Sequence, residues 1–141
     1  MEQTYYLIIM GALLLEYALS TISSILNMNS ITEKVPDGFQ DHYNDEKHAK
    51  SQAYLRDNTR FGLISGTFSL GLTLVVIHTG LFGILDTFVR GSTVNPIMAG
   101  LMFFGILFIV NDILNLPFSI YGTFVIEERY GFNKTTPKTF I

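Results

Sequence analysis

The stretch Leu107–Asn133, LFIVNDILNLPFSIYGTFVIEERYGFN, begins as an apolar membrane-spanning pattern and ends as a charged segment that suits water. Lipid chains cannot hydrogen-bond the side chains of Asn111, Asp112 and Asn115, so these groups need a protein or water partner inside the bilayer. At helical spacing they share one face with Ser119. The pattern predicts a helix whose polar face lines a hydrated cavity or seals a helix–helix contact.

Pro117 lies inside this predicted helix. A proline has no N–H to donate, so the carbonyl of Ile113 loses its helical partner and a bend is favoured. The released carbonyl lies next to the polar face. We therefore expect the helix to be kinked around a cavity.

The composition indicates a membrane protein. Of the 141 residues, 48% are hydrophobic and only 15% are charged, and the apolar residues are gathered into long runs. The net charge of -3 argues against nucleic-acid binding. Because the chain has no cysteine, it has no disulfide framework, no thiolate zinc ligand and no prenylated CAAX end of its own. We expect an all-α, multi-pass membrane fold.

Three apolar runs are each long enough to cross a hydrocarbon core of ~30 Å. They cover about residues 5–27, 61–82 and 97–126. The polar connection 28–60 is predicted to hold a cytoplasmic helix, capped by Asn44, that leads into the second span. Small residues at helical spacing in the second span predict close helix packing. They are Gly62, Gly66, Ser65, Ser69 and Thr73.

Local signals predict how the later elements begin and end. The residues between the second and third spans read as a short exit and turn, where Asp86 and Arg90 can pair if a helix persists. Asn95 and Pro96 are predicted to start the third span. Gly131 is predicted to end it as a left-handed cap.

Glu16 interrupts the middle of the first apolar run. A charged side chain at the centre of a membrane helix costs ~2.5 to 3.5 kcal/mol on insertion scales. Two interpretations stay open. The carboxyl group is protonated and hydrogen-bonded to a neighbouring helix, or it belongs to a polar chamber.

The basic residues predict the orientation of the spans. The first connection holds five Lys and Arg residues and the tail holds three, which makes eight, against Arg90 alone in the second connection. Basic loops stay in the cytoplasm. We expect the amino terminus outside and the carboxy terminus in the cytoplasm, in a bacterial inner membrane or the endoplasmic reticulum.

Two blocks of residues resemble the amino-terminal membrane region of the type I CAAX prenyl proteases, which are integral-membrane zinc metallopeptidases. The segment Leu116–Thr136 reads LPFSxYxTFVIEExxGFNKxT, a long pattern that mixes apolar, acidic and turn residues. The other block precedes and enters the second span. It consists of Tyr43, Lys47, Ser51, Tyr54, Arg56, Arg60 and Phe61.

The resemblance implies a larger enzyme that hydrolyses prenylated or other membrane-associated polypeptides, with zinc held by an HExxH motif. No HExxH occurs in these residues, so we expect no catalytic, cofactor or metal site in this chain, and no activity from it alone. It would be the amino-terminal part of a helical membrane barrel, and its partners would be the bilayer, a carboxy-terminal zinc-binding part and the substrate.

Two sets of residues are candidates for a role within that barrel. The candidate chamber-lining residues are Glu16, Asn111, Asp112, Asn115 and Ser119. The candidate family-motif contacts are Glu127, Glu128 and Asn133, which could brace the zinc domain, touch substrate or keep a helix end soluble. Two alternatives remain: a stand-alone, non-enzymatic three-helix protein that binds lipid or a partner, and a transporter segment with a broken helix at Pro117.

Overall fold

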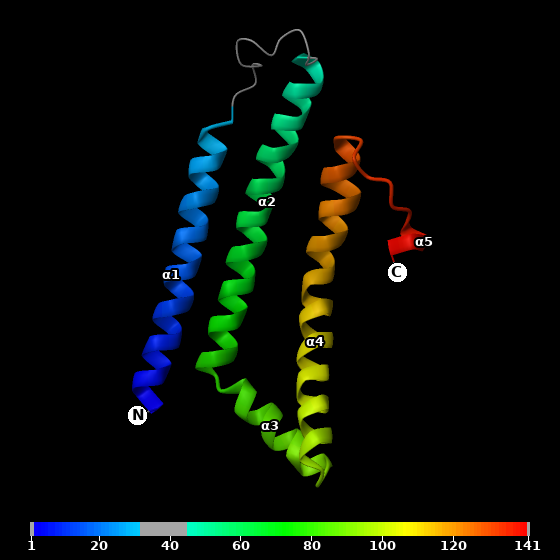
Figure 1. Cartoon of the computed structure of the whole chain (residues 1–141). Helices are drawn as coiled ribbons and strands as arrows, with labels where there is room; N and C mark the ends of the chain where they lie inside the picture. Colours follow the sequence, from blue (N-terminus) through cyan, green and yellow to red (C-terminus); the bar gives the residue numbers. More distant parts are fainter. Residues whose placement is uncertain (1, 32–44, 141) are drawn as a thin grey trace. The chain divides into compact units, whose positions relative to one another are not determined.

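The computed structural model describes residues 2–31 and 45–140, and within them the chain is helical, without a strand (Figure 1). The elements are α1 (Glu2–Asn29), α2 (Asp45–His78), α3 (Leu81–Ser92), α4 (Pro96–Tyr121), a π-helix (Gly122–Glu127) and α5 (Pro137–Phe140). Three helical stretches are long and apolar enough to cross a membrane: Gln3–Asn29, Glu46–His78 and Pro96–Glu127. The predicted all-α, multi-pass fold is confirmed. Asn44 and Tyr43 lie outside the described residues.

The chain forms two compact units, which we describe separately. The first consists of Met1–Thr67 and Ile120–Ile141, and the second of Phe68–Ser119. In the first unit, α1 meets α2 where the hydroxyl groups of Tyr17 and Thr67 share a hydrogen bond. In the second unit, α2 meets α4 through the rings of Phe68 and Phe118, whose centroids are 5.0 Å apart.

Very few side chains are buried. Among the described residues, the hydrophobic side chains that are buried are those of Val89, Ala99 and Ile126. The most apolar windows of the three spans are 0%, 0% and 6% buried. Because apolar surface on this scale is unfavourable in water, lipid or further protein has to cover these helices.

The start of α4 and the ion pair before it confirm two local predictions. The Asn95 side-chain oxygen accepts a hydrogen bond from the backbone N–H of Ile97 at 2.9 Å, as an N-cap does. Pro96 follows at the first helical position, where its missing N–H would have had no partner. The Arg90 Nε atom lies 2.8 Å from Asp86 Oδ2, one helical turn away.

The end of the second span differs from the prediction. Helix α2 starts at Asp45 and runs without a break into the membrane span, as expected, but it ends at His78 rather than near residue 82. The reason is Gly80, whose φ of 70° lies in the left-handed region that glycine adopts without steric cost. Instead of a short exit and turn, the chain then forms the separate 12-residue helix α3.

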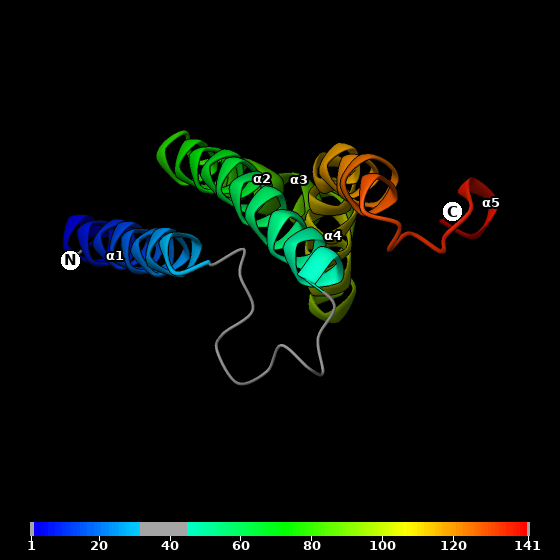
Figure 2. The same cartoon turned by 90° about the horizontal axis from the view of Figure 1, so that it is seen from above.

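The end of the third span has the predicted cap. Gly131 has a φ of 69°, its N–H donates to the Glu128 carbonyl at 3.0 Å, and the Phe132 N–H donates to the Glu127 carbonyl at 2.9 Å. These two bonds form a Schellman motif. Helix α4 continues through Pro117 to Tyr121, and the π-helix that follows was not predicted. Beyond Gly131, both views show the chain leading away from the helix end to α5 (Figures 1 and 2).

Replacing Gly131 tests this cap. Gly131→Ala should lower the free energy of unfolding by about 1 kcal/mol, because a side chain disfavours the left-handed conformation. The matched control is Gly100→Ala in α4, where an added Cβ atom meets nothing within 4 Å and alanine favours the helix. Unfolding in mixed detergent micelles, followed by circular dichroism, measures both. Equal effects of the two variants would contradict the cap.

Candidate functional site

Aromatic and charged side chains meet where the first part of α2 faces the end of the third span. We call Tyr54, Asp57, Arg129, Tyr130 and Phe132 the junction. The Tyr54 ring lies 5.6 Å from that of Tyr130 in an edge-to-face arrangement and 4.8 Å from that of Phe132, centroid to centroid. Such aromatic pairs contribute beyond their buried area. The junction therefore ties two segments of the first unit that are more than seventy residues apart.

One carboxylate oxygen of Asp57 accepts both polar side-chain contacts of the junction. Asp57 Oδ2 accepts a hydrogen bond from the Tyr130 hydroxyl at 2.7 Å and another from Arg129 Nη1 at 3.2 Å. The bond to Asp57, and then burial, raises the pKa of Tyr130 above its usual value. The Arg129 side chain is 59% exposed and that of Asp57 is 30% exposed, so water screens the ion pair.

A second ring contact lies further along α2. The rings of Phe61 in α2 and Tyr121 at the end of α4 are 5.0 Å apart and tilted by 31°. A Cβ atom on Gly122 would lie 3.8 Å from the Phe61 ring. Gly122 also begins the π-helix, so the wider helical turn starts where the two segments approach each other.

The three candidate family-motif residues lie at the end of the π-helix and in the turn that follows it. Asn133 Nδ2 donates to Glu128 Oε2 at 3.0 Å, and the Asn133 side-chain oxygen accepts the Thr135 N–H at 2.7 Å. The backbone carbonyl of Glu127 takes part in the helix cap, while no hydrogen bond to its carboxylate is found within the described ranges. Glu128 and Asn133 thus stabilise the turn locally, and their further roles stay predictions.

The candidate chamber-lining residues lie on exposed surfaces of their helices. Asn115 Nδ2 donates to the Asn111 carbonyl at 2.7 Å and to Asn111 Oδ1 at 3.1 Å, so the side-chain N–H groups of Asn115 have their partners within α4. Glu16, Asp112 and Ser119 are exposed. In the part of the chain that the structure describes, the carboxylates of Glu16 and Asp112 have no hydrogen bond or ion pair. The chamber role of this set remains a prediction.

The small-residue stripe of the second span does not pack closely within the described residues. A Cβ atom at Gly62 or Gly66 would meet nothing within 4 Å. The hydroxyl groups of Ser65 and Thr73 donate to backbone carbonyls of their own helix, those of Gly62 at 3.1 Å and Ser69 at 2.9 Å. Close helix packing on this stripe stays a prediction.

Comparison with known proteins identifies the family. Residues 24–141 match the sequence profile of a family described as CAAX prenyl protease N-terminal, five membrane helices. This chain belongs to that family. Of its relatives, the probable CAAX prenyl protease 1 of Schizosaccharomyces pombe is 34% identical over 79% of this chain. The CAAX prenyl protease 1 of Saccharomyces cerevisiae is 30% identical over 96% of it.

A solved structure agrees with this assignment. The crystal structure of S. mikatae Ste24p matches 95% of this chain with a TM-score of 0.84 and 29% sequence identity. The match covers 33% of the Ste24p chain, and the two relatives are covered over 26% and 32% of their length. The chain thus spans about a quarter to a third of the proteins it resembles.

In this member of the CAAX prenyl protease family, the junction joins the two blocks that carry the resemblance. Tyr54 comes from the block before the second span, and Phe132 comes from the block that ends the third. Asp57 and Tyr130 were not singled out from the sequence. Two features of the sequence could have pointed to these residues. Asp57 is an acid among basic residues in α2, and Tyr130 is next to the capping glycine.

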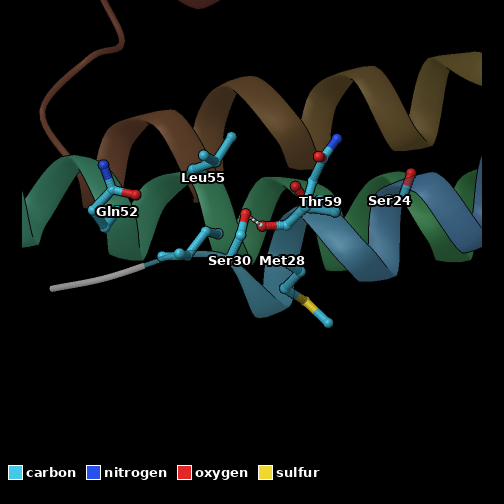
Figure 3. A pocket seen from close by; sticks show the side chains of 8 residues that line it. Ser24, Met28, Ser30, Gln52, Leu55 and Thr59 are labelled. Carbon is cyan, nitrogen blue, oxygen red and sulfur yellow. Dashed lines mark hydrogen bonds between the residues drawn. The ribbon is translucent and has the colours of Figure 1, made fainter.

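A groove of about 350 Å³ lies between the end of α1 and the first part of α2. In this groove the Ser30 hydroxyl donates to the Asn27 carbonyl at 2.8 Å, and Figure 3 marks a hydrogen bond at Ser30 with a dashed line. Its lining mixes hydroxyl and amide groups with aliphatic ones and has no charge. The lining residues are Ser24, Asn27, Met28, Ser30, Ile31, Gln52, Leu55 and Thr59. Sequence reasoning did not predict the groove, because two separate helices form it.

The described residues do not fit a metal site. No group of three or more His, Cys, Asp or Glu side chains among them is arranged to hold a metal ion. A zinc site needs three or four such ligands at about 2 Å. We therefore assign no metal chemistry to the residues described.

Proposed function

We propose that this chain forms part of the wall of a hydrated membrane chamber in a zinc metalloendopeptidase that processes prenylated CAAX proteins or other membrane-associated polypeptides. The observation that carries the proposal is the family match over residues 24–141. The relatives named above are CAAX prenyl proteases, which favours this function over a stand-alone lipid- or partner-binding protein. The zinc ligands would come from outside the described residues.

The polar side chains inside the spans support the chamber part of this proposal. Glu16 and Asp112 are exposed on helices that cross the membrane. A carboxylate is costly in hydrocarbon unless water or a partner reaches it. Water that reaches each of these helices would meet that need, and a hydrated interior would also give a polypeptide substrate a path through the bilayer.

The junction gives the chain a second role, as a brace. The excess of basic residues in the first connection and the tail supports a cytoplasmic position for the junction and an outside position for the amino terminus. Its rings and the Asp57 bonds would hold the ends of two spans together. Glu127, next to the junction, would then be available to the zinc-binding part.

Cleavage of a lipidated peptide tests the proposed function. Membranes containing the product of the complete reading frame should cleave a farnesylated peptide that ends in a CAAX sequence. The same peptide without the farnesyl group should be cleaved much more slowly, because it lacks the apolar chain that concentrates it at the bilayer. Membranes without the gene product are the control. Absence of cleavage of both peptides would contradict the protease assignment.

A further inference from the structure

Helix α3 has three edges with different surroundings. At 100° per residue, Leu81, Ile84 and Phe88 lie along one edge, and they are 44%, 63% and 64% exposed. Val89 lies on a second edge and is only 1% exposed, so α3 is packed on that side. Arg90 lies on the third edge. One apolar edge of α3 is thus left without a partner in the second unit.

The connections of α3 keep it at the membrane surface. Only Thr79 and Gly80 separate it from α2, and three residues, 93–95, separate it from α4. Two or three residues reach at most ~7 to 11 Å. Both neighbours are membrane spans, so both ends of α3 are held close to the face of the bilayer where α2 ends and α4 begins.

The length and charge of α3 decide how it meets that bilayer. Twelve residues make a helix of ~18 Å, too short to cross a hydrocarbon core of ~30 Å. The Asp86–Arg90 pair occupies the polar side, where the Arg90 side chain is 67% exposed and that of Asp86 is 48% exposed. Since one acid faces one base, α3 carries no net charge. An amphipathic helix of this kind lies in the plane of the interface.

We propose that α3 is an interfacial membrane helix, with Leu81, Ile84 and Phe88 inserted among the acyl chains below the lipid headgroups. The Asp86–Arg90 pair faces water. The occupant of the apolar edge is the bilayer to which α2 and α4 already anchor the helix. Because the edge is apolar and α3 is neutral, its insertion does not require anionic lipid. This inference does not depend on the protease assignment.

Single tryptophans test the proposal, since the chain has no tryptophan of its own. Phe88→Trp places the reporter on the apolar edge. Gly83→Trp is the matched control, because it lies 140° away on the polar side and a Cβ atom there meets nothing within 4 Å. Each 141-residue variant is reconstituted in phosphatidylcholine vesicles whose acyl chains are brominated either near the headgroup or near the methyl end.

The indole of Phe88→Trp should be quenched at least about twice as strongly by shallow bromines as by deep ones, and the Gly83→Trp indole only weakly. Ile84→Trp is a second reporter on the same edge and should behave like Phe88→Trp. Replacing half of the lipid with phosphatidylglycerol should leave the quenching unchanged. Equal quenching of both edges, stronger quenching by deep bromines, or quenching that requires anionic lipid would overturn the proposal.

Discussion

An Asn115→Cys variant should react with a water-soluble thiol reagent at least about ten times faster than an Ile113→Cys variant, because thiols react as thiolates, which need water. The two positions differ by only ~3 Å in depth but lie ~200° apart around α4. Both side chains are exposed on the helix. The comparison therefore separates a water-facing polar face from a lipid-facing apolar one at nearly the same depth.

Ser119→Cys gives a second reporter on the polar face, nearly isosteric with the natural side chain. Residues 1–141 contain no cysteine, so this region adds no background labelling. The reaction is best followed in membranes that contain the product of the complete reading frame. Equal slow labelling at positions 113, 115 and 119 would show a dry environment on both faces and would refute the chamber.

Removing the neighbouring carboxylate extends this test. Asp112→Leu should slow the labelling of Asn115→Cys, because the charged group that holds water on this face is lost. Ile113→Leu changes the opposite face without a charge and is the matched control. A labelling rate that does not respond to Asp112→Leu would show that Asp112 does not help to hydrate position 115.

Disrupting the contacts of the junction should clearly lower the stability of the folded protein. A double-mutant cycle of Asp57→Ala and Tyr130→Phe should give a favourable coupling energy of about 1 to 2 kcal/mol, since hydrogen bonds to charged groups are the stronger ones. The 2.7 Å bond to a carboxylate that is only 30% exposed is the reason. Equilibrium unfolding in mixed detergent micelles measures all four proteins.

The matched cycle replaces Tyr130→Phe with Arg129→Ala. Its coupling with Asp57→Ala should be below about 1 kcal/mol, because the Arg129 side chain is 59% exposed and its bond is longer, 3.2 Å. A larger coupling for Arg129 than for Tyr130 would mean that the ion pair, and not the tyrosine hydroxyl, holds the junction. A coupling energy of zero in both cycles would show that these polar contacts of the junction do not stabilise the fold.

The contribution of Tyr130 to the stability of the folded protein should also decrease at alkaline pH. The pKa of Tyr130 is raised in the folded protein, mainly by the bond to Asp57. Its stabilisation is therefore fully present below the unfolded tyrosine pKa of ~10 and is lost as the pH rises through the higher folded value. Tyr130→Phe should abolish this alkaline loss. Persistence of the same loss in that variant would assign it to another group.

Local features of the structure could be predicted because short stretches of chain determine them. The start of the third span at Asn95 and Pro96, the Asp86–Arg90 pair and the left-handed Gly131 depend on neighbours within a few residues. The end of α2 was placed about four residues too late. Hydropathy continues through Leu81 and Phe82, so the apolar pattern alone could not show that a left-handed Gly80 would start a new helix there.

The candidate site was predictable only in part. The polar face of α4 was expected to need a protein or water partner, but the sequence did not show that Asn111, one turn earlier, is a partner of the Asn115 amide. Asp57 and Tyr130 were missed. Their pairing depends on how one helix is placed against a segment more than seventy residues away, and hydrophobic periodicity carries no information about that placement.

By itself, the sequence determined that this is a helical membrane protein with three spans, and that Asn95, Pro96 and Gly131 bound the third of them. Runs of apolar side chains and the backbone preferences of Asn, Pro and Gly act locally, whatever surrounds them. Only the tertiary structure decided that Tyr54 and Asp57 meet Tyr130 and Phe132, and that one edge of α3 stays uncovered. Contacts of that kind follow from packing between distant segments, where shape and distance, not local pattern, set the energy.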